Sequence, residues 1–285
     1  MTKPKSRWRW LSIPVLLYLS ILILLAAFER FLVYPAPPSD DGTWHAAQFD
    51  ADDVTFQSAD GTKLHGWFWD HPQPRAHVLF CHGNGEHVGY LGPGMQWLSQ
   101  RLQVSIFAID YRGYGKSDGK PFEAGLLQDG EAAQTWLAER AGIEPQDVVL
   151  YGRSLGGGIA VHLASTVGTR ALITERTFHS MVDIGAGHYP FLPVRMLMRN
   201  RYLSAEKITN YSGPLLHLHG TTDRVVPLSS GRTLYDACPS ENKRFLEIPG
   251  MGHNDPAPAE FYEAISELLA SLNDIDQHNP QVELE

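Results

Sequence analysis

The sequence predicts an α/β protein with a mostly parallel sheet that is covered by helices on both faces. From residue 77 to residue 272, short apolar runs typical of buried strands alternate with longer stretches of helical periodicity. Such alternation requires crossover connections, which make the strands parallel and place helices over both faces of the sheet. Apolar residues make up 43% of the 285 residues and charged residues 19%, which is enough apolar material for the core of one large domain.

The predicted domain begins with an antiparallel pair of strands. Strand-like residues 53–58 and 63–70 flank Ala59-Asp60-Gly61, a hairpin turn signal. Six further strands are predicted at residues 77–81, 104–109, 148–151, 171–174, 215–218 and 245–248. Helices are predicted at residues 95–102, 123–141, 154–167, 230–237 and 260–272. Between Glu175 and Pro214 there is no strand-like run, which predicts a short helical insertion rich in apolar and arginine residues.

An uncharged apolar run at residues 11–28 predicts a transmembrane anchor, because about 18 residues is the lower limit for crossing a bilayer core. Residues typical of a membrane interface flank it, namely Lys3, Lys5, Arg7, Trp8, Arg9 and Trp10 before it and Glu29 and Arg30 at its end. The basic side is expected to stay in the cytoplasm. The catalytic domain is therefore predicted on the non-cytoplasmic side of a single-pass membrane protein, facing the periplasm from the inner membrane if the source is bacterial.

A cleaved signal peptide is the competing interpretation of this run. Signal peptides have shorter apolar cores and a small-x-small cleavage site, which Ala26-Ala27-Phe28 matches poorly. We therefore favour an uncleaved anchor. The flanking charges argue against a buried helix of the domain.

The segment around Ser154 carries the most specific signal for chemistry. A strand-like run leads into Gly152-Arg153-Ser154-Leu155-Gly156, and a helical pattern follows. A nucleophile at such a junction sits in a strained turn that needs small neighbours, and the following helix directs its positive dipole end at developing negative charge. The pentapeptide alone is weak evidence, but its context makes Ser154 the candidate nucleophile. A phosphate-binding loop would need Gly-Lys-Ser/Thr, which is not present here.

Two further candidates follow predicted strands, at the end of the sheet where α/β proteins build their sites. Asp223 lies just after the strand at residues 215–218, and His253 lies just after the last strand. The chain order of serine, aspartate and histidine is one in which catalytic triads occur. In the predicted mechanism His253 takes the proton of Ser154, and Asp223 fixes the imidazole tautomer.

The loop His82-Gly83-Asn84-Gly85 is the predicted source of an oxyanion hole, because acyl transfer needs two backbone N–H donors aimed at the tetrahedral oxyanion. One donor is predicted at Leu155, which follows the nucleophile, and the other at Asn84, with Gly85 as the alternative. His82 is expected to shape this loop. An ordinary tight turn is the other interpretation.

Charge and metal-ligand patterns narrow the choice of function. Residues 31–285 hold 18 basic and 31 acidic residues, a net charge of about -13, which argues against nucleic-acid binding. Cys81 and Cys238 form no disulfide framework, and a single bridge between them is left open. His217 and His219 alternate on a strand, where packed histidines are favoured over a metal pair. No metal site and no cofactor are predicted.

Together the motifs at residues 82–85, 110–117, 152–157, 219–227 and 250–254 resemble the α/β-hydrolases of the Bem46 and serine-aminopeptidase-like (S33-like) group. The resemblance spans residues 50–272 and implies the α/β-hydrolase fold, with an eight-stranded sheet, a compact lid that matches the predicted insertion, and often an N-terminal membrane segment. The group's activities include esterase and lipid or thioester hydrolysis. The sequence departs from the group at Glu175-Arg176-Thr177-Phe178, where a Glu-Ser/Ala-Pro-Phe type run is usual. This departure affects the lid entry and the pocket wall rather than the triad.

We accordingly predict four segments. Residues 1–30 form a cytoplasmic basic stub and the transmembrane anchor, residues 31–49 a linker, residues 50–273 the hydrolase domain with a lid at about 176–213, and residues 274–285 an acidic flexible tail.

The predicted function is a membrane-anchored serine hydrolase of carboxylic esters or thioesters, including lipid-derived ones. The predicted substrate-binding residues are His82, Tyr114, Phe178 and Phe191. Apolar lid residues near an anchor suggest an acyl-chain substrate, with lipid phosphates or solvent facing Arg195, Arg199 and Arg201. The alternatives are a serine peptidase with aminopeptidase-like activity and a non-catalytic membrane scaffold.

Overall fold

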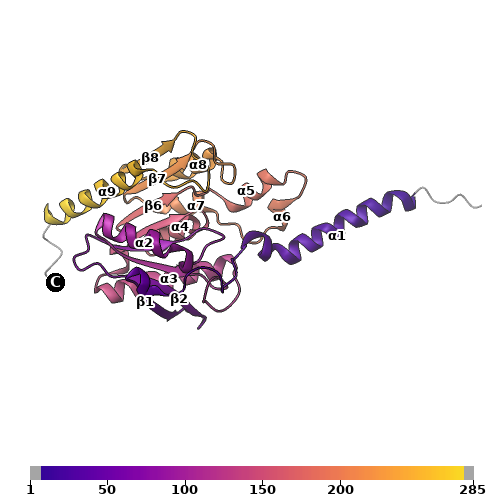
Figure 1. Cartoon of the computed structure of the whole chain (residues 1–285). Helices are drawn as coiled ribbons and strands as arrows, with labels where there is room; N and C mark the ends of the chain where they lie inside the picture. Colours follow the sequence, from indigo (N-terminus) through magenta and orange to yellow (C-terminus); the bar gives the residue numbers. More distant parts are fainter. Residues whose placement is uncertain (1–7, 279–285) are drawn as a thin grey trace, which may run out of the picture.

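The computed structural model describes residues 8–278, and an eight-stranded sheet lies at its centre (Figure 1). The strands are β1 (Asp52–Gln57), β2 (Lys63–Trp69), β3 (His77–Cys81), β4 (Ser105–Asp110), β5 (Val149–Arg153), β6 (Ala171–Glu175), β7 (Leu215–Gly220) and β8 (Lys243–Ile248). Their order is β1-β2-β4-β3-β5-β6-β7-β8. The pairs β1–β2 and β2–β4 are antiparallel and every other pair is parallel, so the predicted sheet is confirmed.

Helices cover both faces of the sheet, as predicted. One face carries α3 (Glu123–Ala141), α4 (Leu155–Thr166) and α8 (Leu228–Ala237), and the other carries α2 (Val88–Leu102) and α9 (Ala259–His278). Two short 3-10 helices, η1 (Ala46–Phe49) and η2 (Pro145–Asp147), lie in connections. The predicted helix at residues 123–141 has the same bounds in the structure.

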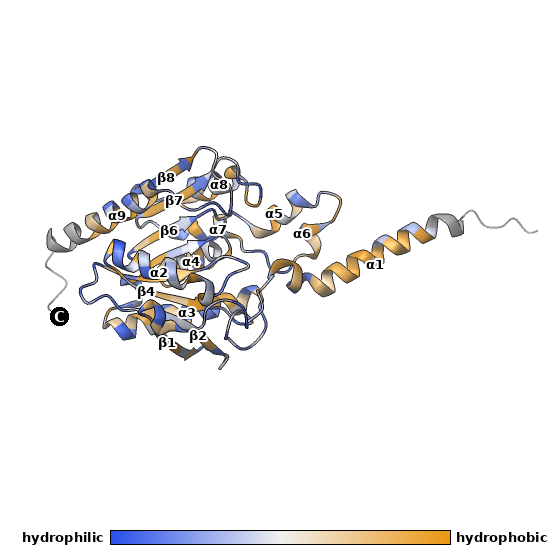
Figure 2. Cartoon of the chain, viewed as in Figure 1, coloured by the Kyte–Doolittle hydropathy of each residue, from blue (hydrophilic) through white to orange (hydrophobic). Residues whose placement is uncertain are grey.

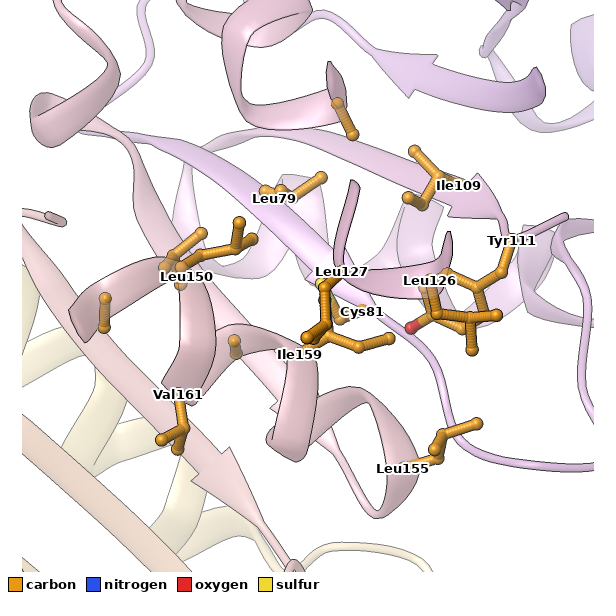
Figure 3. Close-up of a cluster of buried hydrophobic side chains, with 14 of the residues drawn as sticks. Leu79, Cys81, Ile109, Tyr111, Leu126, Leu127, Leu150, Leu155, Ile159 and Val161 are labelled. Atoms are coloured by element: carbon orange, nitrogen blue, oxygen red, sulfur yellow. The ribbon is translucent and has the colours of Figure 1, made fainter. Parts of the chain in front are cut away.

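Strand β3 shows how the sheet is buried on both sides. Its Leu79 and Cys81 belong to the same buried cluster as Leu126 of α3 and Ile159 of α4 (Figure 3). The intervening Phe80 faces the opposite core, which is shared with α2 and α9. This alternation is the reason that β3 reads as a continuous apolar run in the sequence.

Helix α2 begins at Val88, well before the predicted start at residue 95. Its first half contains Pro93 and three glycines, which weaken the helical signal. One of them, Gly92, leaves room for a ring, because a methyl group there would lie 2.4 Å from Phe49. Val88 and Met95 are buried in the core, so tertiary packing outweighs local propensity here.

Helix α1 (Trp8–Val33) projects away from the domain, and most of its residues are hydrophobic (Figures 1 and 2). Its stretch Ser12–Val33 is long and apolar enough to cross a membrane. The helix does not end at Glu29 and Arg30, as predicted, but continues to Val33. The Glu29 carboxylate is bound by N–H groups of the insertion, so this charge does not interrupt the helix.

The ends of the chain are only partly described. Lys3, Lys5 and Arg7 of the predicted basic stub lie outside the described residues, as do residues 279–285 of the predicted tail. Helix α9 continues to His278, so its last turn reaches into that predicted tail.

The predicted insertion lies between β6 and β7 and consists of short helices. They are α5 (Met181–His188), α6 (Val194–Leu197), α7 (Ser204–Lys207) and the 3-10 helix η3 (Ile208–Asn210). Helices α5 and α6 extend from the domain on the side from which α1 projects (Figure 1). Cys81 and Cys238 are both buried free thiols, so no bridge joins them.

Candidate active site

Ser154 occupies a strained turn between β5 and α4. Its φ of 51° and ψ of -115° are a conformation that non-glycine residues rarely adopt. The turn depends on the two glycines of the motif. A methyl group on Gly152 would lie 2.5 Å from the Gly156 carbonyl oxygen, and one on Gly156 would lie 2.0 Å from the Cys81 carbonyl oxygen. The local sequence therefore permits a turn that presents the Ser154 hydroxyl at the end of the sheet.

Three side chains from distant segments meet at this turn. Ser154 Oγ lies 3.0 Å from His253 Nε2, and His253 Nδ1 lies 2.7 Å from Asp223 Oδ2. Because the carboxylate can only accept, His253 donates from Nδ1 and its Nε2 is free to accept the serine proton. Asp223 is held in turn by the backbone N–H groups of Val225 and Val226, which donate to its Oδ1 at 2.9 and 2.8 Å.

The electrostatics of the carboxylate suit an orienting role. The Asp223 side chain is fully buried, and the His253 side chain is 12% exposed. Burial works to raise the pKa of Asp223, but the hydrogen bond and charge of His253 outweigh it and hold that pKa below its ordinary value. Asp223 is therefore ionised at neutral pH and stabilises a positive charge on the imidazole.

The loop after β3 lies directly against Ser154, the candidate nucleophile. A methyl group on Gly83 would lie 3.5 Å from the Ser154 Cβ. The Gly83 N–H is already bound by the Glu86 carboxylate at 3.0 Å, and Asn84 is the next residue along the loop. Of the two predicted oxyanion donors, Asn84 therefore borders the cavity in front of Ser154, and Gly85 is not one of its lining residues.

The Asn84 side chain joins this loop to the end of α1. Its Nδ2 donates to the Val33 carbonyl at 2.7 Å, and its Oδ1 accepts from the Tyr114 hydroxyl at 2.6 Å. Beside this contact, the Tyr34 hydroxyl lies 2.9 Å from both Asn200 Oδ1 and the Tyr202 hydroxyl. The C-terminal end of α1 is therefore built into the domain next to the site and is more than a flexible connection.

A cavity of about 790 Å³ opens in front of Ser154 and His253. One part of its wall is apolar and is formed by Phe80, Leu91, Met95, Leu98, Phe178, Met181, Ile184, Val225 and Val226. Another part is polar and is formed by Glu86, Arg153, Glu175, Arg176, Asp255 and Tyr262. The volume suits a small-molecule substrate with an apolar portion.

Three of the four predicted substrate-binding residues do not line this cavity, and Phe178 does. His82 and Tyr114 are fully buried beneath the loop after β3. His82 Nδ1 donates to the Gly83 carbonyl at 2.8 Å, and burial lowers its pKa to about 4, so it is a neutral residue of the loop. Phe191 is 89% exposed at the outer end of the insertion. Sequence position near a motif did not reveal which way these side chains point.

Sequence reasoning missed Arg176 as part of the site, although it noted the unusual run in which Arg176 lies. Arg176 is buried with a φ of 50°, and its guanidinium pairs with Glu175. It also donates to the backbone carbonyls of Gly252 and Asp255, on either side of His253. The neighbouring residue Thr177 donates from its hydroxyl to the Ser154 carbonyl at 2.7 Å. The segment at residues 175–177 therefore contacts both the nucleophile turn and the histidine loop.

His217 and His219 are packed residues of β7. Both are fully buried, and they form a chain of contacts from Thr174 through His217 and His219 to the Val226 carbonyl, with distances of 2.8, 3.2 and 2.8 Å. Among residues 8–278, no group of three or more histidine, cysteine, aspartate or glutamate side chains is placed to hold a metal ion.

The chain is similar to known proteins both in its sequence and in its fold. Residues 72–179 match the family described as serine aminopeptidase, S33. The uncharacterized protein YfhR of Salmonella typhi is 34% identical over 269 residues, which cover 88% of each chain. The α/β-hydrolase domain-containing protein WAV2 of Arabidopsis thaliana is 30% identical, with 81% of this chain and 83% of WAV2 covered.

Two solved structures share the fold at low identity. The esterase Pf2001 of Pyrococcus furiosus superposes with a TM-score of 0.68 at 20% identity, covering 82% of this chain and 98% of the esterase. The monoacylglycerol lipase of Paleococcus ferrophilus superposes with a TM-score of 0.57 at 22% identity, covering 73% of this chain and 99% of the lipase. At these identities the likeness concerns the fold.

Proposed function

The chain belongs to the serine aminopeptidase-like family of α/β-hydrolases, and from this premise we propose that it is a membrane-anchored serine hydrolase of carboxylic esters or thioesters. One observation carries the proposal. The Ser154 hydroxyl, the His253 imidazole and the Asp223 carboxylate form a continuous chain of contacts at 3.0 and 2.7 Å. A serine hydroxyl is a weak nucleophile at neutral pH unless a base takes its proton, and this chain supplies the base and its orienting acid.

The proposed reaction proceeds through an acyl-enzyme. His253 accepts the Ser154 proton while Oγ attacks the acyl carbon, and the N–H groups of Leu155 and Asn84 stabilise the oxyanion. When the tetrahedral species collapses, the ester or thioester bond breaks and His253 gives its proton to the departing alcohol or thiol. Water then attacks the acyl-enzyme with His253 again as base, which releases the acid and restores Ser154.

The cavity favours an ester with an acyl chain over an aminoacyl amide. An aminopeptidase needs a free carboxylate for the substrate's amino group. Glu86 is paired with Arg153 and the Gly83 N–H, and Glu175 with Arg176. Asp255 accepts the Gly252 N–H at 2.7 Å and has no cationic partner in the described part of the chain, so it is the wall carboxylate that a substrate amine would reach. The apolar wall can accept a hydrocarbon chain, which an ester or thioester of a fatty acid would supply.

Peptidase activity is kept as a second candidate because the matching family is described as serine aminopeptidases. Turnover of aminoacyl amides and of p-nitrophenyl esters by the same preparation distinguishes the two. We expect ester turnover to dominate and to vary with acyl-chain length. A higher kcat/KM for an aminoacyl amide would favour the peptidase.

Anchoring by α1 is supported by its length and composition and by its direct contacts with the domain. The basic residues that precede it favour a catalytic domain on the non-cytoplasmic side. The mature protein should then retain residues before position 29, which N-terminal sequencing of the membrane fraction would test.

Covalent labelling by a fluorophosphonate tests the chemistry directly. We expect the full-length protein in detergent to be labelled at Ser154 and Ser154→Ala to be inert in both labelling and ester hydrolysis. Ser271→Ala, which changes an exposed serine on α9, is the matched control and should react like the wild type. A folded wild-type protein without labelling, or an active Ser154→Ala variant, would reject the proposed mechanism.

A further inference from the structure

The lid tip, which we define as residues 189–198, exposes an unusual amount of apolar surface. Phe191 is 89% exposed, Met196 85% and Tyr189 61%, and no large apolar side chain outside α1 is as exposed among the described residues. Isolated exposed apolar residues are common on protein surfaces, but several in one projecting segment mark an interaction surface.

Two contacts fix the position of the insertion along α1. Near the base of the tip, Glu29 Oε1 accepts from the backbone N–H groups of Arg199 and Asn200 at 2.8 and 3.0 Å. At its outer end, the Tyr18 hydroxyl donates to the Phe191 carbonyl at 3.0 Å. Tyr18 and Glu29 are eleven positions apart, which is about 16 Å along a helix that rises 1.5 Å per residue. The lid tip therefore runs beside α1 and away from the domain.

These contacts place the lid tip at membrane depth once α1 spans a bilayer. The uncharged run of α1 ends at Phe28, and Glu29 is the first charged residue after it, so we take Glu29 as the boundary of the hydrocarbon core. Phe191, at the level of Tyr18, then lies about 16 Å inside that boundary, near the middle of a core of about 30 Å. We infer that the lid tip inserts into the bilayer beside α1, and that the partner covering its apolar side chains is lipid.

The backbone of the lid tip makes several of its hydrogen bonds internally, as a lipid environment favours. Hydrocarbon offers no hydrogen-bond partners, so polar backbone groups need partners within the protein. The N–H groups of Leu192, Val194, Met196, Leu197 and Met198 all bind carbonyls within the segment. Pro190 and Pro193 have no N–H group. At the outermost position, the Phe191 carbonyl accepts a hydrogen bond from the Tyr18 hydroxyl of α1.

The charged residues near the lid tip are also arranged for an interface. Arg199 lies at the level of Glu29, where lipid phosphates would be found. Arg195 is paired with Asp183, with Nε donating to Oδ1 at 2.8 Å, so it does not present an isolated charge. Arg199 thus lies at the base of the lid tip, and Arg195, the one charged residue within the tip, has an acidic partner.

The insertion also gives lipid a route to the cavity. Helix α5 connects the two regions, because its Met181 and Ile184 line the cavity and its C-terminal end leads into the lid tip. An ester dissolved in the bilayer could follow this apolar surface to Ser154. This part of the inference rests on the proposed hydrolase function, whereas insertion itself does not.

Depth-dependent quenching tests insertion. Full-length Phe191→Cys carrying a thiol-linked fluorophore is reconstituted into phosphatidylcholine vesicles that contain spin-labelled lipids. Unmodified protein treated with the fluorophore reports any labelling of the buried Cys81 and Cys238. Val167→Cys, exposed at the end of α4 and remote from Ser154 at the other end of that helix, is the matched control. We expect strong quenching at position 191 and none at position 167. Equal quenching at both positions would overturn the inference.

A second variant separates insertion from chemistry. Tyr189→Ser/Met196→Ser should hydrolyse a water-soluble short ester like the wild type, and its rate on a long-chain ester embedded in vesicles should fall about tenfold or more. Unchanged rates on the embedded ester would overturn the entry route. If position 191 is quenched but Ser154 does not react with a fluorophosphonate, insertion stands and the proposed function fails.

Discussion

Arg176 is expected to position the histidine loop, and its removal should lower activity without any direct contact with the reacting atoms. The side chain bridges Glu175 and the carbonyls of Gly252 and Asp255, which flank His253. Substituting Arg176→Met keeps the length of the apolar stem and, because methionine is also unbranched at Cβ, leaves the strain of the positive φ nearly unchanged.

The size of the effect follows from the burial of the pair. The side chains of Glu175 and Arg176 are each 3% exposed, so the interaction belongs to the buried class of ion pairs and not to the weak surface class. Removing one partner of such a pair leaves an unpaired buried charge and costs about 3–5 kcal/mol of stability. A displacement of about 1 Å at His253 would lower kcat about a hundredfold.

The double variant Glu175→Gln/Arg176→Met separates these two effects. It removes both charges, and a glutamine at position 175 still accepts the hydrogen bond of Tyr151, so most of the stability should return. Urea unfolding and steady-state ester hydrolysis in detergent measure both quantities. We expect the double variant to unfold near the wild-type midpoint while kcat stays about ten- to a hundredfold low, because the histidine loop still lacks its donor.

A folded double variant with wild-type kcat would refute this reasoning. Arg176 would then only balance the charge of Glu175.

Two further predictions concern protonation. Asp223→Asn should lower kcat by about four orders of magnitude with little change in KM, because an amide at this position favours the wrong tautomer of His253. Asp236→Asn, at an exposed aspartate on α8, is the matched control, and a loss of less than tenfold for Asp223→Asn would contradict the assigned role. His82 has a folded-state pKa of about 4 against an ordinary value of 6.5, so the unfolded chain takes up the proton first as the pH falls. That difference removes about 3 kcal/mol of stability between pH 6.5 and pH 4, and His82→Asn should show a correspondingly smaller loss in urea unfolding at the two pH values. An identical pH dependence in both proteins would show that His82 is not responsible.

The fold was predictable because its signals are local or periodic. The apolar run of β3 predicts a strand buried on both faces, and the turn at residues 59–61 predicts the antiparallel pair of β1 and β2. Helix α2 was recognised only in its second half, because Pro93 and its glycines hide a helix that tertiary packing stabilises.

By itself the sequence determined where the reactive residues lie along the chain. Ser154, Asp223 and His253 each follow a strand, and the ends of parallel strands meet at one edge of the sheet, so their meeting could be expected from position alone. The directions of side chains depend on segments far away in the sequence, and only the tertiary structure decided them. It buries His82 and Tyr114 and turns Phe191 outward beside Tyr18. It also places the Arg176 guanidinium against the backbone next to His253. Local patterns carry no information about such neighbours, because packing sets each direction through contacts between distant parts of the chain.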